Sequence, residues 1–323
     1  MDENLTNGGE LGSAVTQGPV AMVTASILSL ACMAGCASSR PFTPGDVPKN
    51  TQLALSPNGS RLLVSWWDSE KKFHAKLVEL NGKEVSSARE ITLPSHTFTT
   101  AFGKGNDRLL VTTLDKSASE LFKIDLKKDG AKDVATLIYK SPFMMRYPLE
   151  VSDGNYVFLE AQSLGDRYSH WKRFQNGEKT LLNSRPFSLA APLTVIDEGL
   201  FLLVPSTPPS FFSLQGTVPA ALNGMVDSST FQIECADRNP LACVRTNIHF
   251  DPTYSTMEIL NGQQRCNIDG RWIDYRELYI SRDGSTLVFH AALTELDGPR
   301  AIYIVKNINL NCSANAISVM GNK

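Results

Sequence analysis

The sequence predicts an all-β chain, a six-bladed β-propeller of four-stranded antiparallel blades that follows a signal segment and a flexible tether. Short apolar runs rich in β-branched and aromatic residues alternate with Asn-Gly and Asp-Gly turns along most of the chain. These turns recur at similar steps, and four-stranded units at a step in the forties are typical of propellers. A β-sandwich or a pair of small β domains is the alternative, because short strands with close turns fit those folds too.

The first unit spans residues 53–83. Its first turn is Ser56-Pro57-Asn58-Gly59, in which Asn-Gly tolerates the positive φ of a tight hairpin. An apolar and aromatic strand is expected at 62–67, then a charged turn, and a second strand at 73–80 that ends in Asn81-Gly82. One small sheet cannot bury both of its faces alone, so we expect further copies to cover it.

The rest of the chain supplies those copies. Steps of 47, 48, 45, 40 and 45 residues separate six turn positions, and six units fit between residues 50 and 310. The positions are Gly59, Asn106, Gly154, Gly199, Asn239 and Gly284. Apolar strands follow most of them. We therefore assign residues 51–315 to the propeller and 316–323 to a tail.

Two of these turns carry a family motif. Ser-Pro-Asn-Gly-Ser-Arg at 56–61 and Ser-Arg-Asp-Gly-Ser at 281–285 resemble the repeat of TolB-type propellers, and Ser152-Asp153-Gly154 is a shorter version. The family has a Ser-Pro-Asp-Gly-Lys/Arg turn before the second strand of each blade, and Arg282 stands where it usually has Pro. The resemblance implies partners among envelope lipoproteins or peptidoglycan-associated complexes. An obvious TolB amino-terminal domain is absent, and prolyl-oligopeptidase-type enzymes share the repeat, so it indicates architecture rather than function.

Residues 1–35 resemble a lipoprotein signal peptide. An apolar run of about 16 residues, 20–35, is too short for a membrane span. It ends in Met-Ala-Gly-Cys, which resembles the lipobox of bacterial lipoproteins, so Cys36 is the predicted lipidated residue and Cys32 a poorer candidate. No Lys or Arg lies in the first 35 residues, although such peptides usually begin with basic residues. The alternative is a buried apolar segment with two incidental cysteines.

Residues 36–50 form the predicted tether, because three prolines stand there among small polar residues. A globule on such a tether suits the bacterial cell envelope, anchored by lipid to the outer membrane and facing the periplasm. The remaining cysteines suit an oxidising compartment. Cys235 and Cys243 flank a predicted hairpin turn and would lie within disulfide reach, which leaves Cys266 to pair with Cys312. Free buried thiols are the alternative.

Composition and motifs give little support to catalysis or nucleic-acid binding. The net charge is -2, and Lys71-Lys72 and Lys127-Lys128 are most simply solvated loop tips, so no nucleic-acid partner is expected. The chain has no Gly-x-Ser-x-Gly elbow, no phosphate-binding loop and no His pair at metal-ligand spacing. We expect no catalytic residue, no metal and no cofactor.

Aromatic residues supply the candidates for partner binding. Trp171 and Trp272 could present a carbohydrate- or peptide-binding face, although packing between blades is the favoured alternative. Phe211 and Phe212 follow Pro208-Pro209, which would break a strand, so a rim loop with exposed rings is expected there.

These observations predict a lipid-anchored envelope propeller that acts as a non-enzymatic protein-docking module and binds an envelope protein. A hydrolase or lyase with an active site in the axial funnel is the alternative, and a carbohydrate-binding module is another. Three or four converging His or carboxylate side chains in the funnel would favour the enzyme. A small-molecule ligand is left open.

Overall fold

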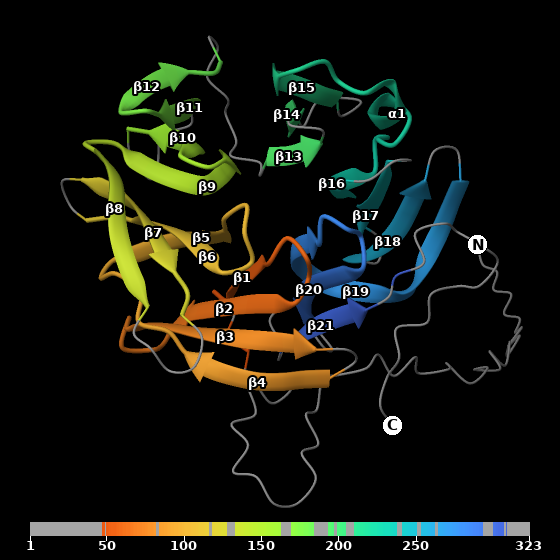
Figure 1. Cartoon of the computed structure of the whole chain (residues 1–323). Coiled ribbons are helices and arrows are strands. Elements are labelled where there is room, and N and C mark those ends of the chain that lie inside the picture. The colour runs from red at the N-terminus through yellow and green to blue at the C-terminus, as the bar shows by residue number, and fades with distance from the viewer. Residues whose placement is uncertain are drawn as a thin grey trace, which may run out of the picture.

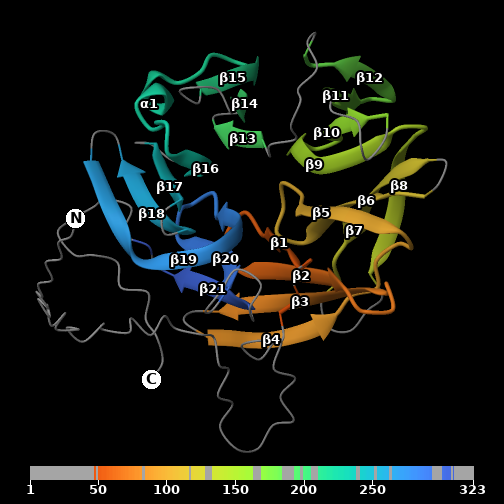
Figure 2. The same cartoon turned by 180° about the vertical axis from the view of Figure 1, so that it is seen from behind.

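The computed structural model shows strands arranged in blades around a centre, with the first strand of each blade innermost (Figures 1 and 2). It describes residues 47–48, 50–81, 84–115, 118–127, 133–162, 169–183, 193–196, 199–204, 210–237, 241–250, 253–261, 264–292, 300–306 and 308.

The first three blades are antiparallel four-stranded sheets. Blade one contains β1 (Gln52–Leu55), β2 (Arg61–Trp67), β3 (Phe73–Asn81) and β4 (Glu84–Glu90). Blade two contains β5 (Thr97–Phe102), β6 (Arg108–Thr113), β7 (Ser119–Asp125) and β8 (Val134–Ser141). Blade three contains β9 (Met144–Ser152), β10 (Asn155–Ala161), β11 (Ser169–Gln175) and β12 (Glu178–Leu181).

The other blades depart from this pattern. Blade four has three described strands, β13 (Leu193–Ile196), β14 (Gly199–Val204) and β15 (Ser210–Gln215), and is followed by the short helix α1 (Ala220–Asn223). Blades five and six share one sheet of β16 (Thr230–Ala236), β17 (Ala242–Phe250), β18 (Thr253–Asn261), β19 (Gln264–Ile280), β20 (Thr286–Ala292) and β21 (Arg300–Lys306). Residues 264–272 of β19 pair with β18 as the outer strand of blade five, and residues 273–280 pair with β20 as the inner strand of blade six.

This arrangement confirms the predicted six-bladed propeller and its turn chemistry. Asn58-Gly59 joins β1 to β2 with φ of 66° at the glycine, and the glycines of Asp153-Gly154 and Asp283-Gly284 have φ of 73° and 72°. Positive φ costs glycine little, since it has no Cβ.

The hydrophobic core lies between blades. One buried cluster joins each neighbouring pair around the ring, because successive side chains of a strand point to opposite faces of the sheet. In β2, Leu63 packs on blade two, whereas Leu62 and Val64 pack toward Val288 and Ile302 of blade six. Both faces of a blade are thus covered, so a middle strand such as β10 is buried along its whole length.

The ring closes between blades six and one. Val47 forms an antiparallel bridge with Arg300, so the described amino-terminal segment pairs with the last strand, β21. The N–H of Arg282 donates to the carbonyl of Pro57 at 2.7 Å. Lys306 Nζ donates to the carbonyls of Gly59 and Leu80 at 2.7 and 3.2 Å.

Polar contacts tie the neighbouring turns at this end of the ring. The N–H of Asn58 in blade one donates to Oδ1 of Asn106 in blade two at 3.0 Å. The N–H of Lys104 in turn donates to Glu150 of blade three at 3.0 Å, and Arg108 pairs with the same carboxylate at 2.8 Å. Glu150 is fully buried. This buried, hydrogen-bonded ion pair links blades two and three, and its partners offset the cost of burying the charge.

The described part of the chain contains no helix with the length and apolar character that crossing a membrane requires.

Substituting Gly59 should show how closely blades one and six approach each other. An added Cβ would lie 2.4 Å from Oγ1 and 2.7 Å from Cβ of Thr286, whereas at Gly154 it would meet nothing within 4 Å. Both positions have positive φ, so Gly154→Ala measures the backbone cost, about 1 kcal/mol. We expect Gly59→Ala to lower the free energy of unfolding by about 1–3 kcal/mol more, as overpacking does. Equal losses in urea unfolding would contradict the close contact.

Candidate functional site

The two ends of the ring carry different connections, because consecutive strands are antiparallel. We call the end with the β1–β2 and β5–β6 turns the turn face. The opposite end, the loop face, carries the β2–β3 turn at residues 68–72 and the β4–β5 connection at residues 91–96.

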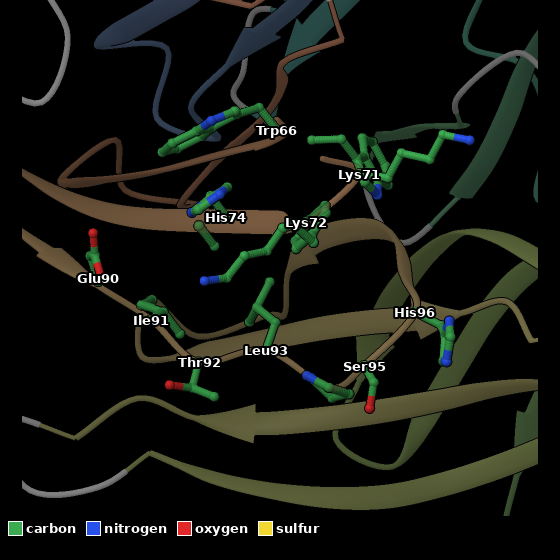
Figure 3. A pocket seen from close by; sticks show the side chains of 14 residues that line it. Trp66, Lys71, Lys72, His74, Glu90, Ile91, Thr92, Leu93, Ser95 and His96 are labelled. Atoms are coloured by element: carbon green, nitrogen blue, oxygen red, sulfur yellow. The ribbon is translucent and has the colours of Figure 1, made fainter. Parts of the chain in front are cut away.

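A groove of about 730 Å³ lies on the loop face between that turn and that connection (Figure 3). Its walls come from both segments and from the strand ends next to them. The lining residues are Trp66, Trp67, Lys71, Lys72, Phe73, His74, Ala75, Glu90, Ile91, Thr92, Leu93, Pro94, Ser95 and His96. Pockets of this volume are typical of ligand and peptide sites.

Aromatic contacts fix the walls of the groove. The ring of Trp66 stacks on His74 with centroids 5.3 Å apart, and Trp67 packs edge-on against Phe73 at 4.8 Å. Both pairs stand directly opposite each other in the β2–β3 ladder, where cross-strand neighbours are closest. The rings are half-buried. The groove therefore offers an apolar surface that is already in place before any ligand binds.

Asp68 organises the β2–β3 turn. Its Oδ1 accepts the N–H groups of Glu70 and Lys72 at 2.9 and 2.8 Å, and its Oδ2 lies 2.7 Å from Nε2 of His74. The hydrogen bond from His74 is the largest of several effects that hold the pKa of Asp68 below its ordinary value. These bonds keep the turn, including Lys71 with φ of 62°, in one conformation.

Charged side chains stand at the edges of the groove. Lys71 and Lys72 are exposed, as the sequence predicts for loop tips, and within the described residues neither forms an ion pair. Glu90 and His96 are also exposed on the lining. Lysines without partners beside an apolar wall suit a ligand that brings both an apolar group and a negative charge.

The axis of the ring is lined by the innermost strands, and β1 contacts both β5 and β19. Side chains tie these strands together. Gln232 Nε2 donates to the carbonyl of Leu278 at 3.2 Å, the N–H of Leu53 donates to Oε2 of Glu277 at 2.5 Å, and Gln52 Nε2 donates to the carbonyl of Phe98 at 2.9 Å. Polar groups at the axis thus link blades five, six, one and two.

Glu234 differs from these strand-linking residues in its protonation state. It lies on the same side of β16 as Gln232, whose Nε2 is 3.3 Å from Oε1 of Glu234. Burial raises the pKa of Glu234 to about 8, so the carboxyl is largely protonated at neutral pH. No three His, Cys, Asp or Glu side chains come close enough to hold a metal ion in the part of the chain that the structure describes.

The aromatic residues that the sequence offers as partner-binding candidates differ in how far they are buried. Trp171 is 1% exposed in the cluster between blades three and four, so the expectation that it binds a partner is wrong and the packing alternative holds. Phe211 and Phe212 lie in strand β15 rather than in a rim loop. Phe211 packs against the core between blades four and five, whereas Phe212 is 44% exposed and can still contact a partner. The side chain of Trp272 falls outside the described residues.

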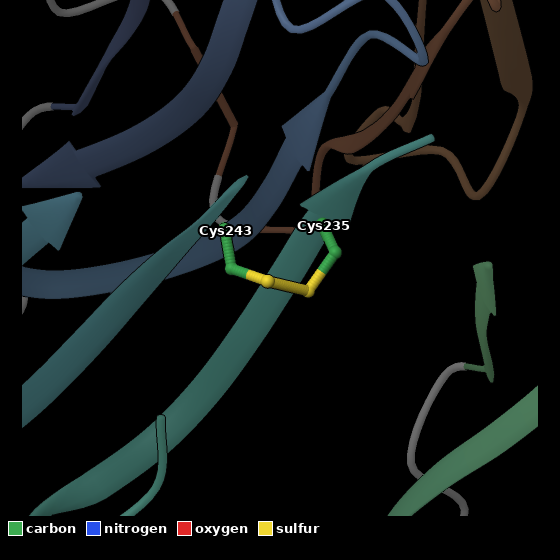
Figure 4. The surroundings of a disulfide bond; sticks show 2 residues. All are labelled: Cys235 and Cys243. Carbon is green, nitrogen blue, oxygen red and sulfur yellow. A yellow bond between two sulfur atoms is a disulfide. The ribbon is translucent and has the colours of Figure 1, made fainter. Parts of the chain in front are cut away.

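Cys235 and Cys243 form the predicted disulfide (Figure 4). They stand directly opposite each other in the β16–β17 ladder, with Cα atoms 4.0 Å apart. Cys266 in β19 is also disulfide-bonded. Cys312, its predicted partner, lies outside the described residues, as does Cys36, and both assignments stay predictions.

The sequence reasoning did not find the groove. Its residues come from a turn and a connection about 20 positions apart, and each segment alone looks like an ordinary polar loop. The Trp66-Trp67 pair immediately before a charged turn was the available signal. Both rings are half-buried and line the groove.

Fold and connectivity together define the chain as an all-β, six-bladed propeller. No protein-family model matches the sequence, and no curated protein does. Among solved structures, it is similar to TolB from Acinetobacter baumannii, with a TM-score of 0.53, 8% identity, and coverage of 76% of this chain and 64% of that one. The chain therefore spans less than two thirds of the TolB chain. This likeness shows the fold, and it agrees with the propeller architecture that the turn motif predicts.

Two archaeal structures also match. The β-propeller domain of the Trilobed protease from Pyrococcus furiosus has a TM-score of 0.47 and 12% identity, with 81% of this chain and 85% of that one covered. The acylaminoacyl peptidase of Pyrococcus horikoshii has a TM-score of 0.47 and 12% identity, with 79% and 43% covered.

Glu234 should make stability depend on pH. Its folded pKa of about 8 is above the ordinary value of 4.5, so the folded chain keeps a proton that the unfolded chain has released. The free energy of unfolding should therefore fall as pH rises between these values, by up to about 1.4 kcal/mol per pH unit from this group. Glu234→Gln should remove that component and gain stability relative to the wild type as pH rises.

Urea unfolding across this pH range measures the difference between the two proteins. Glu178→Gln is the matched control, because Glu178 is exposed on β12, and its difference from the wild type should not change with pH. Parallel pH profiles for the wild type and Glu234→Gln would contradict the assignment.

Proposed function

We propose that this protein is a lipid-anchored docking module of the bacterial cell envelope, which binds an extended segment of another envelope protein in the groove on the loop face. The observation that carries the proposal is the groove itself, a concave and partly apolar surface between the β2–β3 turn and the β4–β5 connection. Preformed sites bind with less loss of conformational entropy than flexible ones, which suits a docking surface.

The lining indicates the chemistry of the segment. Half-buried rings of Trp66 and Phe73 and the side chain of Leu93 suit an apolar side chain of the partner. Lys71 and Lys72 suit an acidic side chain next to it, since neither lysine has an ion pair within the described residues. An exposed charge at the rim of an interface contributes mainly to association rate and specificity.

The location rests on the amino-terminal residues. The Met-Ala-Gly-Cys motif at 33–36 supports attachment of lipid to Cys36, and the proline-containing tether supports a globule held near the surface of the outer membrane on its periplasmic side. One acyl chain alone anchors a protein weakly, so stable attachment needs the several chains that a lipoprotein cysteine carries.

Reversing the charge of Lys72 should weaken docking. A photo-crosslinking residue at the exposed Ser95 position should give one discrete adduct with an envelope protein in intact cells, and Lys72→Glu should lower its yield several-fold because the partner's acidic side chain would then be repelled. Lys104→Glu is the matched control, since Lys104 is exposed in the β5–β6 turn on the turn face, and it should leave the adduct unchanged. No adduct at Ser95 would contradict docking in the groove, and an equal yield with Lys72→Glu would contradict recognition of an acidic side chain by Lys72.

Lipid attachment can be tested at the two cysteines near the amino terminus. Cells grown with an alkyne-bearing fatty acid should label the wild type, and Cys36→Ser should lose the label because no thiol remains to carry diacylglycerol. Cys32→Ser should keep it. The wild type and Cys32→Ser should be recovered in the membrane fraction, and Cys36→Ser should not. Labelling of Cys36→Ser, or none of the wild type, would refute the anchor.

A further inference from the structure

A second feature of the described chain lies at the axis, away from the walls of the groove. Arg146 is in β9, the innermost strand of blade three, where it pairs with Leu159 of β10. Its guanidinium carbon lies 5.1 Å from the ring of Phe98, which is in β5, the innermost strand of blade two. The side chain is half-buried. This cation–π contact orients the guanidinium between two inner strands.

Arg146 has no anionic partner within the described residues. One Nη2 contact to the thioether of Met144 at 3.5 Å is its only hydrogen bond there, and Nε is buried without any partner. Two other arginines of the chain do pair with carboxylates. Arg108 pairs with Glu150 and Asp153, and Arg245 pairs with Asp227 and Glu258. Among the described residues, the remaining donors of the half-buried Arg146 guanidinium are therefore free to bind an anion, and arginine stays charged at any physiological pH.

The surroundings define the kind of anion that fits. A guanidinium presents parallel N–H donors that match the two oxygens of a carboxylate or phosphate. Burial is the main cause that raises the pKa of Tyr147, the residue after Arg146, while the charge of Arg146 lowers it and that of Glu277, on the innermost strand of blade six, raises it, so both charges act on this region. A nearby carboxylate favours an anion of single charge over a dianion. Phe98 and Met144 flank the guanidinium and suit an apolar group on the ligand.

A second polar side chain on a neighbouring inner strand, Thr100, also lacks a hydrogen-bond partner among the described residues. Thr100 is in β5, beyond the register shift at Thr97 and Thr99, and its hydroxyl is buried. Buried polar groups in folded proteins are normally satisfied, so an unpaired hydroxyl is a candidate for contact with a ligand.

We propose that Arg146, with Phe98 beside it, binds a monocarboxylate that carries an apolar group. Two sources have this chemistry, a free organic acid and the carboxyl terminus of a peptide. The site is separate from docking in the groove: it uses inner-strand residues that do not line the groove, and its test does not depend on a protein partner.

The experiment uses the folded protein with two probes and their neutral counterparts. The probes are 4-phenylbutyrate and the peptide Ala-Ala-Phe with a free carboxyl terminus, and the counterparts are the corresponding amides. We expect at least one carboxylate to bind in calorimetry and its amide to bind at least about tenfold more weakly, the loss that follows from removing a charge-assisted hydrogen bond. The tighter carboxylate identifies the source.

Arg146→Gln should weaken carboxylate binding by a similar factor. Arg89→Gln should leave it unchanged, because Arg89 pairs with Asp133 away from the axis. Protection of Arg146 from phenylglyoxal by the bound carboxylate, read by mass spectrometry on the wild type, gives an answer even if a variant folds poorly. Absence of binding by both carboxylates at millimolar concentration, equal binding of acid and amide, or no protection of Arg146 would overturn the proposal.

Discussion

Closure of the ring between blades six and one is the constraint on which the rest of the structure depends. Each blade buries both faces against its neighbours, so an open ring would leave two apolar faces in water. The bridge between Val47 and Arg300 and the contacts of Lys306 with blade one hold the ends together. The local turns alone could not do this, because each of them stabilises only its own hairpin.

The two candidate sites follow from how blades are joined. The groove exists because the charged β2–β3 turn, held by Asp68, stands beside the connection to blade two. The axial arginine faces Phe98 because inner strands of successive blades lie side by side. Most other polar groups described at the axis hold neighbouring strands together, as Gln52, Gln232 and Glu277 do. Among the described residues, the axis is therefore lined mainly by polar groups that hydrogen-bond neighbouring strands to one another. Arg146 is an exception, and the described side chains do not form the group of converging carboxylates or histidines that a catalytic funnel would need.

Local chemistry was predictable from the sequence, and contacts between blades were not. Asn58-Gly59 and Asp283-Gly284 need glycine at positive φ, so both hairpins and their spacing could be predicted. The Cys235–Cys243 bond followed because both residues flank one turn. Burial of Trp171 and the unpaired state of Arg146 depend on which blade lies next, and a blade covered on both faces has no simple alternation to reveal it. The continuity of β19 was not predictable either, since Asp269-Gly270, a pair that elsewhere in the chain marks a turn, lies within this strand.

The continuity of β19 has a mechanical consequence. Blades five and six share one strand, because residues 264–272 of β19 pair with β18 and residues 273–280 pair with β20. The disulfide between Cys235 and Cys243 links β16 and β17, the first two strands of this shared sheet. A hinge between these two blades would have to bend a paired strand, so we expect them to open together rather than one at a time when the protein unfolds locally.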